Sequence, residues 1–168
     1  RLSLESRQAI IGPEQRSWLI KLNKESANIR HALKWAKKND PVRALSMMIS
    51  LGIFYSVTGN FLEGLDNISS ILDAIEIKDK VLLGCAYMWI GFYLMHLGRF
   101  DDASKFLTIS VGLLKESGNQ AELANSINYL GIVKLYEGEV EEANELQEEC
   151  LEIRTKLNDI RGVAASLN

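Results

Sequence analysis

The chain of 168 residues is 47% hydrophobic and 24% charged, with a formal net charge of −3. This composition is typical of one or two globular domains with an apolar core, and neither a membrane-spanning run nor a signal-peptide pattern is present. The two cysteines, Cys85 and Cys150, have no metal-ligand spacing, and we expect a reducing, cytoplasmic setting. Because the sequence starts at Arg1 without methionine and ends in mid-pattern, we expect it to be part of a longer protein.

We expect the first 41 residues to form a helical linker or capping segment. Pro13 suits a helix start, Asn39-Asp40-Pro41 suits a helix end, and a break is expected near 23–26. Residues 1–43 hold ten Lys/Arg and four Asp/Glu, whereas residues 44–168 hold nine and eighteen. The basic side chains indicate either a solvated helix face or a docking surface for an acidic partner; they are Lys21, Lys24, Arg30, Lys34, Lys37 and Lys38.

The remainder of the chain, residues 42–168, repeats itself with a period of about 40 residues. Paired glycines seven residues apart recur three times, and two alanines share the offset of 40: Gly52 and Gly59, Gly91 and Gly98, Gly131 and Gly138, with Ala103 and Ala143. A period in this range indicates a helical array. We expect units at about 42–78, 79–118 and 119–158, with a partial fourth unit at 159–168.

Each unit is predicted to be two antiparallel helices. In the third unit, Gly138 ends the first helix in the position that favours a left-handed residue. Gly131 lies inside that helix, where glycine costs about 1 kcal/mol relative to alanine, so we expect it to permit close helix packing. Ala143 is expected to serve the same purpose on the second helix.

These units resemble the tetratricopeptide repeat, on the residues Tyr87…Ile90-Gly91 and Ile127…Leu130-Gly131 together with the turn glycine and following alanine. The resemblance covers residues 45–168 and implies an all-α, right-handed superhelix of antiparallel helix pairs. The period is 39–40 rather than 34, as in a long-helix subclass. The sequence departs from the usual pattern at three places. Leu94 and Lys134 stand where the repeat usually has an aromatic residue, and Lys115 and Thr155 stand where it usually closes with proline. In the first unit, Gly64 stands where alanine is expected.

The segment from Trp18 to Ala36 contains the motif E-x-x-N-I-R-x-A-L-x-W-A and is similar to a segment of STAND-type bacterial regulators. In that family it lies between a nucleotide-binding switch ATPase and a tetratricopeptide array. The resemblance implies an upstream nucleotide-binding domain of the same chain as a partner, and a role in signal transduction or transcription regulation.

Chemistry-bearing motifs are missing from the sequence. There is no G-x-x-x-x-G-K-[ST] phosphate loop, and His31 and His96 have no ligand-spaced neighbours. We therefore predict no catalytic residue, no metal site and no cofactor. The acidic repeat region also disfavours direct nucleic-acid binding.

A binding surface is predicted instead on the first helix of each unit, which lines the inner face of such an array. Side-chain amides there suit a peptide backbone, and methionines and aromatic residues suit apolar side chains. Packing alone is the other interpretation of this stripe, whose residues are Met88, Phe92, Met95, His96, Asn125, Asn128, Ile132, Tyr136 and Asn168.

Three functions remain open from the sequence. The first is a non-catalytic module that binds a peptide or protein, possibly from its own chain, in the concave groove. The second is a small-molecule effector sensor of a bacterial transcriptional activator. The third is self-association through an apolar face of the partial fourth unit, at Val163, Ala164 and Leu167.

Overall fold

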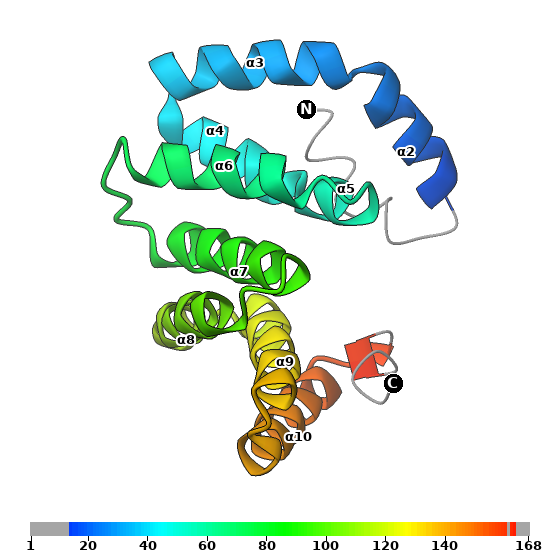
Figure 1. Ribbon diagram of the computed structural model, residues 1–168, viewed down its shortest axis with the longest axis vertical. Coiled ribbons are helices and arrows are strands. Elements are labelled where there is room, and N and C mark those ends of the chain that lie inside the picture. Colours follow the sequence, from blue (N-terminus) through cyan, green and yellow to red (C-terminus); the bar gives the residue numbers. More distant parts are fainter. Residues whose placement is uncertain (1–13, 161, 164–168) are drawn as a thin grey trace. The chain divides into compact units, whose positions relative to one another are not determined.

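The computed structural model describes residues 14–160, 162 and 163, and every regular element in these residues is an α-helix (Figure 1). The chain divides into two compact units, Arg1–Ile77 and Lys78–Asn168. The predicted division lies after residue 41 instead, and the predicted boundaries of the linker and of the repeats stay predictions.

The first unit contains the helices α2 (Gln15–Lys24), α3 (Ser26–Asn39), α4 (Pro41–Ser50), α5 (Gly52–Val57) and α6 (Phe61–Leu72). The break between α2 and α3 falls at Glu25, inside the predicted interval. Asp40 caps α4, because its Oδ1 accepts a hydrogen bond from the Arg43 N–H at 3.1 Å and Pro41 supplies the first turn.

A break at Leu51 separates α4 from α5, so Gly52 is the first residue of α5 rather than an interior residue of one long helix. Gly59 then turns the chain into α6 with a φ of 69°. This region is the most divergent repeat by sequence, and its first helix is correspondingly interrupted.

The second unit consists of two antiparallel helix pairs (Figure 1). The first pair is α7 (Lys80–His96) with α8 (Phe100–Ser117), and the second is α9 (Gln120–Glu137) with α10 (Val140–Lys156). Side-chain oxygens start both first helices: Asp79 accepts from the Val81 and Leu82 N–H groups, and Asn119 accepts from the Glu122 N–H.

A residue with positive φ ends a helix every 20 positions in this unit. The Arg99 N–H donates to the Leu94 carbonyl, and the Glu139 N–H donates to the Lys134 carbonyl, both at 2.9 Å. These bonds close the helix ends on a residue with positive φ. The 40-residue period is therefore two equal halves, closed by Gly98 (φ 74°), Gly118 (φ 74°), Gly138 (φ 85°) and Asn158 (φ 55°).

Small residues let the paired helices approach each other. A Cβ atom on Gly91 would lie 2.5 Å from Leu107 Cγ, and one on Gly131 would lie 2.7 Å from Gln147 Nε2. Ala103 is fully buried, as is its repeat equivalent Ala143. These contacts fix the register in which α8 packs on α7 and α10 packs on α9.

Candidate functional site

A hollow of about 490 Å³ opens between the first helices of the two pairs, α7 and α9, beside the start of α8. Its volume lies in the range of sites that hold a small ligand or a few side chains of a partner. We name it the apolar hollow; its lining residues are Phe92, Met95, His96, Gly98, Phe100, Tyr129, Ile132 and Tyr136.

Aromatic rings form most of this lining. The Phe92 ring centroid lies 4.4 Å from that of His96 and 4.9 Å from that of Tyr129. On the side of the α8 start, Phe100 and Tyr136 stack with centroids 4.7 Å apart and planes 11° apart. Tyr136 is nevertheless 66% exposed, so its ring offers a free surface to a ligand.

The apolar hollow carries little charge. Partial burial lowers the pKa of the His96 imidazole, which favours its neutral form near pH 7. Burial also raises the pKa of the Tyr129 phenol, which therefore keeps its proton. The arrangement suits an apolar or aromatic side chain better than an isolated charged group.

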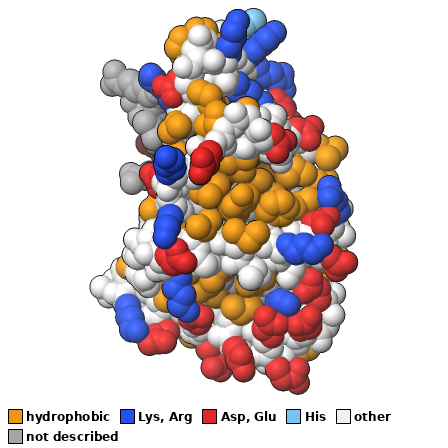
Figure 2. Space-filling model, turned by 90° about the vertical axis from the view of Figure 1, so that its left-hand side faces the viewer, with side chains coloured by type: hydrophobic (Ala, Val, Ile, Leu, Met, Phe, Trp, Pro, Cys, Tyr) orange, Lys and Arg blue, Asp and Glu red, His pale blue; other side chains and the backbone are white. Residues whose placement is uncertain are grey.

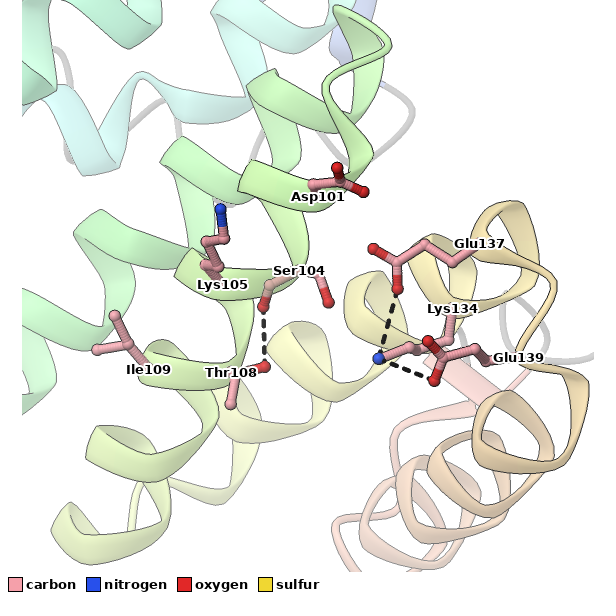
Figure 3. Close-up of a pocket in the computed structure, with 8 residues that line it drawn as sticks. All are labelled: Asp101, Ser104, Lys105, Thr108, Ile109, Lys134, Glu137 and Glu139. Atoms are coloured by element: carbon pink, nitrogen blue, oxygen red, sulfur yellow. Dashed lines mark hydrogen bonds and ion pairs between the residues drawn. The ribbon is translucent and has the colours of Figure 1, made fainter.

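A second hollow, of about 740 Å³, lies between α8 and the turn from α9 to α10 (Figure 3). We name it the acidic hollow; its lining residues are Asp101, Ser104, Lys105, Thr108, Ile109, Lys134, Glu137 and Glu139. In the close-up, Asp101 on α8 faces Glu137 across the opening.

Lys134 lies among three carboxylates, of which Glu137 and Glu139 line the acidic hollow and Glu142 does not. Its Nζ is 3.4 Å from Glu137, 3.2 Å from Glu139 and 3.1 Å from Glu142, and its side chain is only 14% exposed. Burial alone lowers the pKa of this ammonium, but the hydrogen bonds to the three carboxylates outweigh that effect and raise it. Lys134 therefore stays charged and neutralises only one of three carboxylates.

The wider surface near these carboxylates is also acidic. Figure 2 shows Asp and Glu side chains gathered over the lower end, which Figure 1 identifies as the end where α9 turns into α10. The first turn of α10 itself carries Glu141 and Glu142. This field disfavours phosphate-bearing ligands at this end of the unit.

Five of the nine predicted surface residues come together around the apolar hollow. They are Phe92, Met95, His96, Ile132 and Tyr136. Their grouping follows from the 40-residue register, because α7 and α9 present equivalent faces to the same opening.

The other predicted surface residues are placed differently. Met88 is buried on α7, and Asn125 accepts a hydrogen bond from Arg154 Nη2 at 3.3 Å. Asn128 is partly buried, and its backbone carbonyl accepts from Gln147 Nε2 at 3.3 Å. Asn168 lies outside the described residues.

Two residues of the apolar hollow were missed by the sequence reasoning. Tyr129 follows the predicted Asn128 on α9, and Phe100 comes from the start of α8, a second helix. Counting positions along first helices alone could not find Phe100. Its place two residues after the turn glycine Gly98 was the available signal.

The predicted basic surface of the first unit is partly occupied by neighbours in the same unit. Arg30 forms an ion pair with Glu63 at 2.9 Å, and Lys37 Nζ donates to Asn67 and Ser70 at 2.7 and 2.8 Å. Burial lowers the pKa of the Lys37 ammonium. These two cations therefore hold α3 against α6.

No group of three or more His, Cys, Asp or Glu that could hold a metal ion occurs among the described residues. Within the same residues, no helix is both long and apolar enough to cross a bilayer. Cys85 and Cys150 are both buried, and the Cys150 Sγ–H donates to the Ala124 carbonyl at 3.2 Å.

These features define an all-α domain of antiparallel helix pairs with a tetratricopeptide-like fold, as the sequence predicted. The family model described as Tetratricopeptide repeat matches residues 82–156, which form most of α7 to α10. Repeats of this family generally mediate protein–protein interactions and are non-enzymatic scaffolds. The repeat region is therefore of the binding-module type.

Among solved structures, the chain is similar to the crystal structure of BtubC (BKLC) from P. vanneervenii, with a TM-score of 0.68. The two share 19% sequence identity, and the match covers 89% of this chain and 63% of that one. At this identity the likeness shows the fold alone. A comparison with curated proteins gave no significant match.

Proposed function

We propose that the second unit binds an extended peptide or protein segment in the apolar hollow. The observation that carries this proposal is the meeting of α7 and α9 around an opening lined by neutral aromatic and aliphatic side chains. Aromatic residues of this kind supply much of the binding energy at protein interfaces. The surrounding helices are fixed by buried contacts, which limits the ordering cost on binding.

The wider role that we propose is sensing within a larger signalling or transcription-regulating protein. The resemblance of the segment from Trp18 to Ala36 to STAND-type regulators supports this role, with a nucleotide-binding domain upstream in the same chain. A bound segment would influence such a switch only through different affinities for its two states.

A small-molecule effector is the second candidate, and the size of the apolar hollow favours it. About 490 Å³ is large enough for a compact metabolite with an apolar body. The two candidates differ in what the site can contact. A peptide extends beyond the hollow along the helices, whereas a metabolite depends only on the lining residues.

Selection from a displayed random dodecapeptide library on the purified chain tests the proposal. We expect selected peptides whose dissociation constant rises at least about tenfold in Tyr136→Ala, because an exposed aromatic ring at the rim is lost. Leu157→Ala is the matched control, since Leu157 is 44% exposed on the same unit but lines neither hollow. Circular dichroism checks the fold of both variants.

The proposal is wrong if no selected peptide discriminates Tyr136→Ala from the Leu157→Ala control. In that case, thermal-shift screening with small metabolites against the same two variants decides on the effector alternative. Stabilisation that Tyr136→Ala abolishes would support the small-molecule site.

A further inference from the structure

The apolar hollow and the acidic hollow meet at one ridge. Phe100 and Tyr136 line the apolar hollow, and the residues that follow them, Asp101 and Glu137, line the acidic hollow. The stacked pair of Phe100 and Tyr136 therefore forms the ridge between the two. A segment that fills one hollow can cross this ridge into the other.

The acidic hollow keeps a surplus of negative charge after its internal pairing. The lining holds three carboxylates, those of Asp101, Glu137 and Glu139, but only two ammonium groups, those of Lys105 and Lys134. Lys105 lies 3.6 Å from Asp102, a carboxylate that does not line the hollow. Asp101 has no basic side chain within ion-pair distance in the part of the chain that the structure describes. The Asp101 carboxylate thus faces the opening without a cation (Figure 3).

The Glu139 carboxylate on the far side is ionised at neutral pH. The hydrogen bond from the Lys134 ammonium, 3.2 Å away, lowers the pKa of Glu139. A cation that enters between Asp101 and Glu139 would meet negative charge from α8 on one side and from the α9–α10 turn on the other. A guanidinium or ammonium group suits this position, and an anion does not.

We infer that the partner of this surface is a basic peptide: an apolar anchor residue fills the apolar hollow, and an arginine or lysine a few residues away enters the acidic hollow. This inference rests on the proposed function and adds the chemistry of the partner to it. The apolar hollow supplies most of the affinity, and the acidic hollow selects the charge and orientation of the segment.

The selected dodecapeptide pool tests the composition of the partner directly. We expect Arg or Lys to be enriched within a few positions of an apolar residue, relative to the unselected library. A synthetic peptide from the pool is then compared with its own Arg→Gln or Lys→Gln version on the purified chain. We expect the neutral version to bind about tenfold more weakly at low salt, and the difference to shrink as salt rises.

Variants of the acidic hollow locate the contact. In the double variant Asp101→Asn/Glu139→Gln, we expect the basic peptide to lose about tenfold in affinity, while the neutral version changes less than twofold. The matched control is Glu145→Gln/Glu148→Gln, which removes two exposed carboxylates of α10 that line neither hollow. This control should leave both peptides within about twofold of the original chain.

Two results overturn the inference, and they are distinguishable. If Tyr136-dependent peptides emerge without basic residues, or if both double variants weaken the basic peptide equally, the charge selection is wrong and the proposed function stands. If no Tyr136-dependent peptide emerges at all, the proposed function fails and the inference fails with it.

Discussion

The two helix pairs of the second unit share the same backbone register but differ in the side chains that pack at equivalent positions. Gly91 and Gly131 occupy equivalent positions, 40 residues apart, on the first helix of each pair. The residue that covers Gly91 is Leu107, which is fully buried, whereas the one that covers Gly131 is its equivalent, Gln147. The same close approach is filled by an apolar side chain in one pair and by an amide in the other.

A second equivalent contact is a side-chain hydrogen bond to a backbone carbonyl in both pairs, but its donor is a hydroxyl in one pair and a thiol in the other. The Ser110 hydroxyl donates to the Gly84 carbonyl at 2.7 Å, and the Cys150 thiol donates to the Ala124 carbonyl at 3.2 Å. The Ser110 oxygen also lies 2.8 Å from the Ser126 oxygen. Because the one Ser110 hydrogen goes to a carbonyl, Ser126 is the donor in that bond, which links α8 to α9.

The difference shows that the repeat conserves backbone separation rather than side-chain type. A small residue, a helix crossing and a left-handed turn recur in both pairs, and the side chains between them vary in polarity. Stability should therefore depend more strongly on side-chain identity in the α7–α8 pair than in the α9–α10 pair.

The largest expected effect comes from exchanging the two covering residues. Leu107→Gln should lower the free energy of unfolding by roughly 4 kcal/mol. It removes a buried apolar side chain and buries an amide that has no hydrogen-bond partner there. Gln147→Leu should change it by no more than about 1 kcal/mol, because the Gln147 Oε1 is buried and has no hydrogen-bond partner in the described residues. Chemical denaturation of both variants measures the contrast, and equal effects would contradict it.

A smaller contrast is expected at the glycines themselves. Gly91→Ala should destabilise the chain by about 2 kcal/mol, because its Cβ would overlap the branched carbon of Leu107. In Gly131→Ala the flexible amide end of Gln147 can move away, losing a hydrogen bond to Asn128. The gain in helix propensity offsets that loss, so a change within about 1 kcal/mol is expected. Thermal denaturation of both variants measures this contrast. A larger loss of stability in Gly131→Ala than in Gly91→Ala would contradict it.

The sequence predicted much of this unit because its glycine spacing is determined by backbone geometry. Gly98 and Gly138 were placed at turns from their positions alone, and both have positive φ. Gly118 was not predicted at a turn, although it follows Gly98 by 20 residues, because no second glycine stands seven residues from it. The break at Leu51 was not predicted, although Gly52 follows it, because the equivalent glycines Gly91 and Gly131 lie inside uninterrupted helices.

The candidate site was predictable only along single helices. Register counting found Phe92 and Tyr136, but it could not show that Phe100 would stack on Tyr136 from the start of another helix. It also assigned the Asn125 side chain to the groove, which stays a prediction, and it could not show that Arg154 on α10 donates to that side chain. Contacts between helices depend on the crossing geometry, which periodicity does not contain.

The central claim, that the apolar hollow binds a peptide segment, is tested most directly at His96. Its pKa in the folded chain is lowered by burial, so the unfolded chain binds the proton first, and stability is lost as pH falls through 6.5 and then through the folded pKa. An apolar anchor in the hollow should bury the imidazole further.

A nuclear magnetic resonance titration of His96, with and without a selected peptide, makes this measurement. We expect the pKa of His96 to lie below 6.5 in the free chain and to decrease further when the peptide is bound, with affinity falling as the pH is lowered. A His96 titration that is unchanged by saturating peptide would contradict the assignment of the binding site to the apolar hollow.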